Sequence, residues 1–339
     1  MVDLNVATPP SFEPTIALPV TPLGKALVFL LRGIGKLPIA TRGAVGASIG
    51  RLIGRIPFRE QKIVVAQLAL FQKHLAKPVT PSDVFAHVAR VTMESVDLTP
   101  VLKNPDNHVR CEMWPTVETW LRDERPLVVL TGHFGNWDLL AAYAISRGVP
   151  ITTIGREARN PGMQEALRWM RDAYGVETLW RSDKSALKRL ISCLRERRVV
   201  AALIDQDTRV ESIFTPFFGR DTRTPSSLVE LGKKFDARFV YAFLHRNNDA
   251  APGSPSFDLI TGELPNQGTT EEILSAYHHQ LERLVSLSPE QWVWFHKRWR
   301  SQRDGTTMSS RVYLQWLQDE RAKNIRELPH HHHAMSIHT

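Results

Sequence analysis

The amino-acid sequence predicts an α/β fold, in which a central, mostly parallel sheet is flanked by helices and preceded by a helical amino-terminal segment. Three observations support this prediction. After Val109, short apolar runs alternate with longer stretches of helical periodicity, as in parallel βαβ units. The chain has 339 residues, 42% of them apolar and 23% charged, which suits a packed globular core. Polar side chains follow three of the predicted strands, where open α/β sheets bind their ligands.

Four regions are expected along the chain. Residues 1–22 are rich in proline and lack periodicity, so we expect a disordered leader that is not a secretory signal. Residues 23–105 are expected to be helical, and residues 106–305 to form the α/β domain. Residues 306–339 are expected to hold one helix and a disordered tail that contains a run of four histidines, His330 to His333.

The amino-terminal region shows helical spacing of apolar residues in segments 23–34, 61–75 and 81–98, and a Gly- and Ala-rich stretch spans 41–56. Basic residues such as Arg32 and Arg51 lie among them. None of the apolar runs reaches the roughly 18–20 residues of a membrane span. The pattern favours helices lying in a membrane interface. The alternative is ordinary amphipathic core packing.

The α/β region is expected to alternate strands with helices. The predicted strands are 127–130, 151–154, 177–180, 199–204, 239–244 and 257–261. The predicted helices between and after them are 136–147, 161–174, 185–197, 225–234, 271–287, 290–299 and 309–325.

Charge and cysteine content restrict the possible partners. The net charge of +8 suits an anionic partner, such as nucleic acid, an acidic membrane surface or phosphorylated and thioester-linked substrates. Nucleic acid is disfavoured because no zinc-knuckle, helix-turn-helix or aromatic RNA-binding signature is present. The two cysteines, Cys111 and Cys193, show neither metal-site nor disulfide spacing, which indicates a reducing compartment.

The first polar cluster follows the predicted strand 127–130. His133 lies between Gly132 and Gly135, and Asp138 follows on the first turn of the next helix. A carboxylate that fixes the tautomer of a histidine makes it a general base for a hydroxyl group. The alternative is a helix-capping aspartate beside a structural histidine.

Two further clusters follow other strands. Arg156 and Arg159 are suited to bind phosphate or a developing oxyanion, or they form a surface pair. Asp205 and Asp207 are suited to orient an arginine, cap a loop or bind a metal. Because the carboxyl ends of parallel strands share one edge of a sheet, these clusters are expected to converge with His133.

The segment after Asp207 is apolar and then rich in hydroxyl groups. Phe214 and Phe217 are suited to line a groove for an acyl chain, although phenylalanine is more often a core residue. Thr224 precedes a predicted helix, whose amino terminus is a possible anion site.

Taken in order, these blocks resemble the lipid A biosynthesis acyltransferases, the lauroyl and myristoyl transferases of the wider group with an HX4D/E motif. The resemblance covers roughly residues 23–300. The blocks that carry it are His133 to Asp138, Arg156 with Asn160 and Pro161, Asp205 to Asp207, Phe214 to Gly219, Thr224 with Pro225, and Gln291 to Trp299.

The resemblance implies an acyltransferase. His133 would deprotonate an acceptor hydroxyl that attacks an acyl thioester on acyl carrier protein or coenzyme A, and Asp138 would orient His133. Arg156, Arg159 and Asn136 would bind substrate. Asp205 and Asp207 would hold the arginines and loops of the site in place. Phe214 and Phe217 would border the acyl chain, and Thr224 would also belong to the substrate site.

The resemblance also implies a location and a set of partners. The acceptor would be a membrane lipid, and the protein would be peripheral or monotopic on the cytoplasmic face of the inner membrane, bound to its anionic surface. No metal or other cofactor is expected. The cluster of Trp292, Trp294 and Trp299 beside basic residues suits an interfacial helix, or equally a helix packed on the core.

Two other functions stay open at this point. The same pair of residues would make a thioesterase or lysolipid hydrolase with water as the acceptor, although no Gly-x-Ser-x-Gly elbow is present. A non-catalytic lipid-binding protein is the other alternative. The intact set of His133, Asp138 and Arg156 counts against it, because a scaffold does not need all three.

Overall fold

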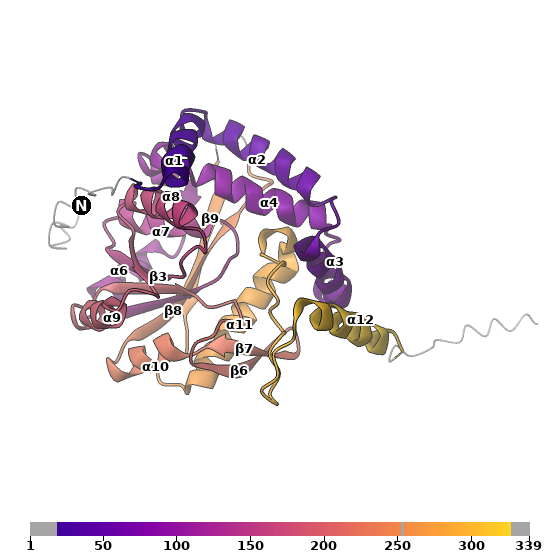
Figure 1. Ribbon diagram of the computed structural model, residues 1–339. Helices are drawn as coiled ribbons and strands as arrows, with labels where there is room; N and C mark the ends of the chain where they lie inside the picture. The colour runs from indigo at the N-terminus through magenta and orange to yellow at the C-terminus, as the bar shows by residue number, and fades with distance from the viewer. Residues whose placement is uncertain (1–18, 252–253, 327–339) are drawn as a thin grey trace, which may run out of the picture.

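The computed structural model describes residues 19–251 and 254–326, arranged as shown in Figure 1. Its α-helices are α1 (Pro22–Gly35), α2 (Ile39–Ile53), α3 (Arg59–Phe71), α4 (Pro81–Glu94), α5 (Thr99–Leu102), α6 (Trp114–Arg122), α7 (Trp137–Ser146), α8 (Pro161–Asp172), α9 (Ala186–Arg195), α10 (Ser227–Lys234), α11 (Thr270–Leu287) and α12 (Ser310–Arg326). Its strands are β1 (Val109–Arg110), β2 (Leu127–Thr131), β3 (Ile151–Gly155), β4 (Glu177–Trp180), β5 (Val199–Leu203), β6 (Ser212–Phe217), β7 (Arg220–Pro225), β8 (Arg238–Arg246) and β9 (Phe257–Glu263). Its short 3-10 helices are η1 (Gln72–His74), η2 (Pro105–Asn107) and η3 (Pro289–Gln291). Most of the expected leader and tail, residues 1–18 and 327–339, lies outside the described residues.

The central sheet has seven strands in the order β1-β9-β8-β2-β5-β3-β4. Neighbouring strands in it run parallel, except β8 and β9, which are antiparallel. Helices cover both faces, as Figure 1 shows, and all five residues of β2 are buried, as expected of a central parallel strand. The predicted α/β fold with a mostly parallel, helix-flanked sheet is confirmed.

A separate hydrophobic core lies on each face of the sheet. Val128 and Leu130 of β2 belong to the core completed by α10 and α11, whereas Leu127 and Val129 belong to the core completed by α7. Successive side chains of a strand point to opposite faces. Thr131, the last residue of β2, therefore points to the α7 side.

The amino-terminal helices are built around a glycine-lined contact. Gly43, Gly46 and Gly50 of α2 face α4, and a Cβ atom at Gly50 would lie 2.2 Å from the carbonyl oxygen of Phe85. Because α2 and α4 meet through their backbones, the apolar side chains of α2 are not needed for this contact and project outward. No helix among the described residues combines the length and the apolar character needed to cross a membrane.

Two segments could not be assigned correctly from the sequence. Residues 213–219, for which no helix or strand was predicted, belong to the β6–β7 hairpin. The predicted helix 290–299 is wrong, since only η3 is helical there and an irregular segment follows. In that segment Trp292, Trp294 and Trp299 are fully buried against Phe71 and Phe217, so the interfacial interpretation of these tryptophans is also wrong. Their indole N–H groups donate to acceptors inside the core, so these groups do not need water as a hydrogen-bond acceptor.

Candidate active site

The chain turns sharply after β2, and two glycines make the turn possible. Gly135 has a φ of +62°, and a Cβ atom there would lie 1.8 Å from the carbonyl oxygen of Leu244. A Cβ atom on Gly132 would lie 2.9 Å from Oη of Tyr277 and 3.1 Å from Cγ of Asp205. Gly135 therefore supplies a left-handed backbone conformation, and Gly132 lets Asp205 approach the turn closely.

His133, between these glycines, is held by Asp205. The backbone N–H of His133 donates to Oδ2 of Asp205 at 2.8 Å, and its ring Nδ1 lies 2.8 Å from Oδ1. The two residues meet because β2 and β5 are parallel neighbours and each residue follows the carboxyl end of its strand. Asp205 is buried, whereas 22% of the His133 side chain is exposed. With Nδ1–H donating to the carboxylate, Nε2 is the ring atom that can accept a proton from a ligand.

The surroundings of Asp205 keep it ionised. Nε1 of Trp292 donates to Oδ2 at 2.9 Å. Burial alone would raise the pKa of Asp205, but the attraction of His133 and the hydrogen bonds that His133 donates outweigh burial and hold the pKa well below its usual range. Asp205 is therefore equipped to stabilise the imidazolium form of His133 after proton uptake.

Asp138, the predicted partner of His133, does not contact it. Asp138 lies in the first turn of α7, and its Oδ1 is 3.5 Å from Nη2 of Arg171 on α8. The predicted pairing is thus replaced in the structure by the pair of His133 and Asp205. The physical reason is directional: the imidazole ring points along the sheet edge to β5, whereas the first turn of α7 directs Asp138 towards α8.

Two residues that the sequence did not single out complete the surroundings of His133. The amide Nε2 of Gln206 lies 3.1 Å from Nε2 of His133 and 2.8 Å from Nε2 of His296. Burial, followed by the charge of His133, lowers the pKa of His296 to about 3, so this ring is neutral. A neutral His296 ring accepts from Gln206, whose second amide hydrogen stays available beside His133, since Nε2 of Gln206 lies 3.1 Å from both ring nitrogens of His133. Gln206 stands between the two aspartates noted in the sequence, and only the fold brings His296 to them.

Three of the predicted substrate-binding residues are placed as follows. Asn136 is buried and caps α7, its Oδ1 accepting from the backbone N–H of Leu139 at 2.9 Å. Arg156 and Arg159 follow β3 and are exposed. Since β5 lies between β2 and β3, these arginines stand on the same edge of the sheet as His133. A binding role for them stays a prediction.

The predicted acyl-groove and anion-facing residues lie mainly in the core. Phe217 is fully buried and stacks on Trp299, with ring centroids 5.7 Å apart. Thr224 is buried in β7, and its hydroxyl accepts from Nη2 of Arg298 at 2.7 Å. Phe214 is half-buried beneath the guanidinium of Arg303. Phe217 and Thr224 are therefore not placed to face a ligand, because hairpin formation turns them inward.

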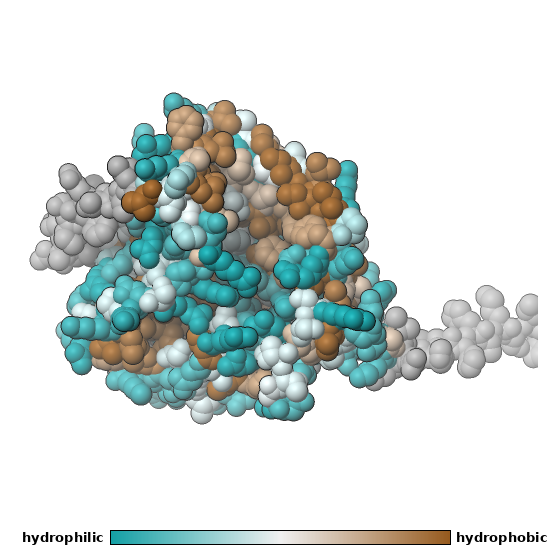
Figure 2. All heavy atoms as spheres, viewed as in Figure 1, coloured by the Kyte–Doolittle hydropathy of each residue, from teal (hydrophilic) through white to brown (hydrophobic). Residues whose placement is uncertain are grey.

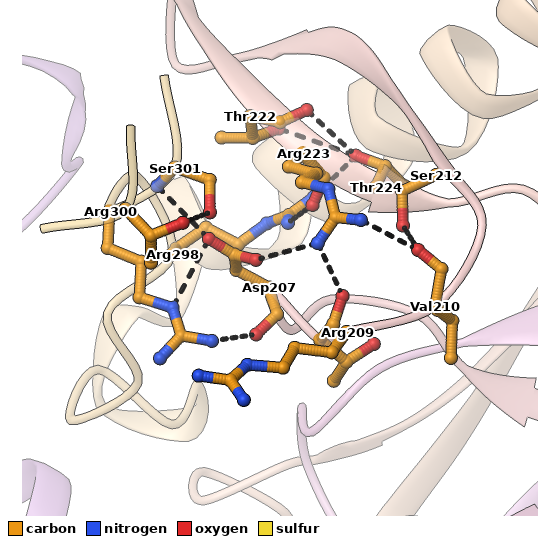
Figure 3. Close-up of polar contacts among 12 residues, drawn as sticks. Asp207, Arg209, Val210, Ser212, Thr222, Arg223, Thr224, Arg298, Arg300 and Ser301 are labelled. Atoms are coloured by element: carbon orange, nitrogen blue, oxygen red, sulfur yellow. Dashed lines mark hydrogen bonds and ion pairs between the residues drawn. The ribbon is translucent and has the colours of Figure 1, made fainter. Parts of the chain in front are cut away.

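Asp207 lies two residues beyond Asp205 and joins two loops. Its Oδ2 accepts from the backbone N–H of Ser301 at 3.1 Å and from Nε of Arg300 at 3.4 Å. These contacts hold the segment after Trp299 against the loop that follows β5 (Figure 3).

An apolar cavity of about 90 Å³ lies between the sheet and helices α6 and α7. Small side chains, Ala201 of β5 and Ala242 of β8, leave space on its sheet side. Trp137 lines the cavity, and its ring centroid lies 5.2 Å from that of His133. The cavity therefore extends from the deep part of the sheet to Trp137, the ring that neighbours His133.

Comparison with known proteins gives a consistent result. The family model of the bacterial lipid A biosynthesis acyltransferases matches residues 10–301. The lipid A biosynthesis acyltransferase of Haemophilus influenzae is 24% identical over 190 residues, which cover 56% of this chain and 58% of that protein. The lipid A biosynthesis lauroyltransferase of Escherichia coli is 22% identical over 306 residues, which cover 87% of this chain and 97% of that protein.

Proposed function

The chain belongs to the bacterial lipid A biosynthesis acyltransferase family, and from this premise we propose that it transfers a fatty acyl chain from a thioester to a hydroxyl group of a lipid A precursor or a related membrane glycolipid. The observation that carries the proposal is the pair of His133 and Asp205, separated from an apolar cavity by the ring of Trp137. Such a pair suits a base that acts on a hydroxyl, and the cavity suits an aliphatic chain.

In the proposed reaction His133 acts first as a base and then as an acid. The acceptor hydroxyl donates to Nε2 of His133 and attacks the thioester carbonyl while its proton passes to the ring. Asp205 stabilises the resulting imidazolium. The second amide N–H of Gln206 is near enough to donate to the oxyanion, since Nε2 of Gln206 lies 3.1 Å from Nε2 of His133. Collapse of the tetrahedral intermediate breaks the C–S bond, and the departing thiolate takes the proton back from His133.

The acyl chain is proposed to occupy the cavity beneath Trp137. Its lining is almost entirely apolar, and it runs along the α7 side of β2, β3, β5 and β8. Each buried methylene contributes about 0.8 kcal/mol, so the depth of the cavity sets which chain length binds best.

Replacing Ala201 by leucine is expected to shift the donor preference towards shorter chains. Ala201 lies opposite Val129 in the β2–β5 pairing, partway down the cavity, so a larger side chain fills the space beyond it. The ratio of kcat/KM for a long donor to that for one four carbons shorter should fall by about tenfold or more. Ala202→Leu is the matched control because Ala202 faces the opposite core. An unchanged ratio in Ala201→Leu would contradict the proposal that the acyl chain binds in the cavity.

The apolar outer surface of α1 and α2 is proposed to rest on the membrane. Figure 2 shows apolar residues gathered over these helices. Phe29 is 81% exposed and Leu52 is 62% exposed, and Ile49 and Ile56 are exposed as well. Lys36 and Arg55 lie at the helix ends, where they suit anionic headgroups. The proposed location is the cytoplasmic face of the inner membrane, where thioester donors are made.

The double substitution Ile49→Asp, Leu52→Asp is expected to weaken binding to vesicles that contain anionic phospholipid by about 100-fold or more. Each exposed Leu or Ile that enters the interface contributes about 1.5–3 kcal/mol, and a buried carboxylate opposes insertion. Sedimentation with vesicles measures the change. Leu187→Asp serves as the control, because Leu187 is equally exposed but lies on α9, remote from α1 and α2 in Figure 1. Equal binding of both variants would contradict the proposed docking surface.

The proposed reaction is tested with labelled acyl thioesters of acyl carrier protein and coenzyme A. The purified protein is given each donor with a total membrane lipid extract, and mass spectrometry identifies every lipid that gains a chain. An ester-linked acyl gain on one glycolipid is expected. Release of fatty acid without any acylated lipid would replace the transferase by a hydrolase that uses the same histidine.

A further inference from the structure

A cluster of arginines lies beside the active site but outside the proposed chemistry. It consists of Arg209, Arg223 and Arg300 around Asp207, and Figure 3 shows Asp207 between Arg300 and Arg223. Arg209 belongs to the loop after β5, Arg223 to β7, and Arg300 to the segment that follows Trp299. Three separate parts of the chain thus bring guanidinium groups to one place.

The cluster is held in position by backbone acceptors. Arg223 donates to the carbonyl oxygens of Thr208 at 2.9 Å and Val210 at 2.8 Å. Arg300 donates to the carbonyl oxygen of Asp207 at 3.0 Å. The two arginines are nevertheless partly open to solvent, with 30% of the Arg223 side chain and 25% of the Arg300 side chain exposed. They are fixed side chains with an accessible surface, which is the arrangement that binds an anion with little loss of entropy.

Positive charge at this place is not balanced by carboxylates. Asp207 is the acidic side chain that pairs with Arg223 and Arg300, and within the described residues Arg209 has no ion pair. Two of the three guanidinium groups therefore share one carboxylate, and the third has none among the described residues. The pKa of Lys297 nearby is lowered, first by partial burial and then by the charges of Arg300 and Arg59. A dianionic or monoanionic phosphate would relieve this repulsion, and paired guanidinium groups suit its geometry.

The position of the cluster favours the donor as the source of that phosphate. β6 and β7 lie on the opposite side of the molecule from α1 and α2, as Figure 1 shows. An acceptor lipid would arrive from the side of α1 and α2, and a water-soluble donor from the other. Asp207 is two residues from Asp205, at most about 7 Å along the chain, and an arginine side chain reaches several Å further. A pantetheine arm has roughly the length of four extended residues, about 14 Å, so it can join a thioester at His133 to a phosphate at this cluster.

We propose that Arg209, Arg223 and Arg300 bind the phosphate of the 4′-phosphopantetheine arm of the acyl donor. The inference rests on the proposed function, because it assigns a subsite to the thioester donor. Acyl carrier protein and coenzyme A share this phosphate, so the cluster recognises the common part of both donors and not the carrier.

The test compares two small donors that carry the same acyl chain, acyl-pantetheine and acyl-4′-phosphopantetheine. The wild-type protein is expected to have a kcat/KM about 10- to 100-fold higher for the phosphorylated donor, mainly through KM, and added salt should reduce this ratio. In Arg223→Gln and Arg300→Gln the ratio should fall towards one. Arg303→Gln is the matched control, because Arg303 lies nearby but pairs with Asp221, and it should keep the wild-type ratio.

The wild-type ratio decides the inference even where a glutamine variant fails to fold, and Arg300→Lys tests the charge with a smaller change of shape. Equal turnover of both donors would overturn the inference while leaving the acyltransferase proposal intact. If the arginine variants raise only the KM of the acceptor lipid, the inference is also overturned, because the phosphate bound by the cluster would then belong to the acceptor. Turnover of neither donor would speak against the proposed function. In that case the dissociation constants of pantetheine and 4′-phosphopantetheine, measured by calorimetry, would test the phosphate site independently of turnover. The phosphorylated arm is expected to bind more tightly, and equal binding would overturn the inference.

Discussion

The substitution His133→Ala is expected to lower kcat for acyl transfer by about 10³-fold or more, because it removes the base that takes the proton of the acceptor hydroxyl. The fold should survive. Asp205 keeps two of its hydrogen-bond donors in this variant, the backbone N–H of residue 133 and the indole N–H of Trp292. Transfer of a labelled chain under saturating donor and acceptor measures the loss, and the circular dichroism spectrum and the thermal unfolding midpoint check the fold. Wild-type turnover in His133→Ala would exclude His133 as the base.

Asp205→Asn is expected to lower kcat by about 10²- to 10⁴-fold. An asparagine amide at this position can donate to Nδ1 of His133, which selects the tautomer whose Nε2 already carries a proton and is therefore no base. The neutral amide also provides no charge to stabilise the imidazolium. The same transfer assay measures the change.

Asp138→Asn is the matched control for Asp205→Asn. Asp138 contacts Arg171 and not His133, so its substitution is expected to cost less than about tenfold in kcat. Both substitutions exchange a carboxylate for an amide of equal size, and they differ only in which carboxylate is removed. A larger loss in Asp138→Asn than in Asp205→Asn would restore the pairing that the sequence spacing predicted.

The fold could be predicted from the sequence to a large extent, because its signals are local. Apolar runs of four to six residues alternate with helical periodicity, and β2, β3, β5, α7 and α8 follow that pattern closely. The Trp-rich segment could not be predicted in the same way. Its spacing suits a helix, but Trp292 and Trp299 find their acceptors at Asp205 and Phe217, which only the tertiary structure brings near. Trp294 donates to the carbonyl oxygen of Pro289, five residues earlier.

The sequence predicts which strands carry the residues of the candidate site, but not which side chains pair with each other. His133 and Asp205 each follow a predicted strand, and the sheet rule places both on one edge. Which carboxylate reaches the imidazole depends on strand order, since β5 lies directly beside β2. A carboxylate five residues away in the sequence is then farther from the ring nitrogen than one 72 residues away. The apolar cavity was missed for a related reason: it is formed by small residues on one face of several strands, whereas the phenylalanines that suggested an acyl groove turn into the core.

The most direct test of the account is the proton NMR signal of the His133 imidazole, recorded on ¹⁵N-histidine-labelled protein. The account predicts a strongly downfield Nδ1–H resonance, because this proton is shared with an ionised, buried carboxylate. It should be absent in His133→Ala, lost in Asp205→Asn and unchanged in Asp138→Asn. A resonance that persists in Asp205→Asn and disappears in Asp138→Asn would contradict the central claim that Asp205 orients His133.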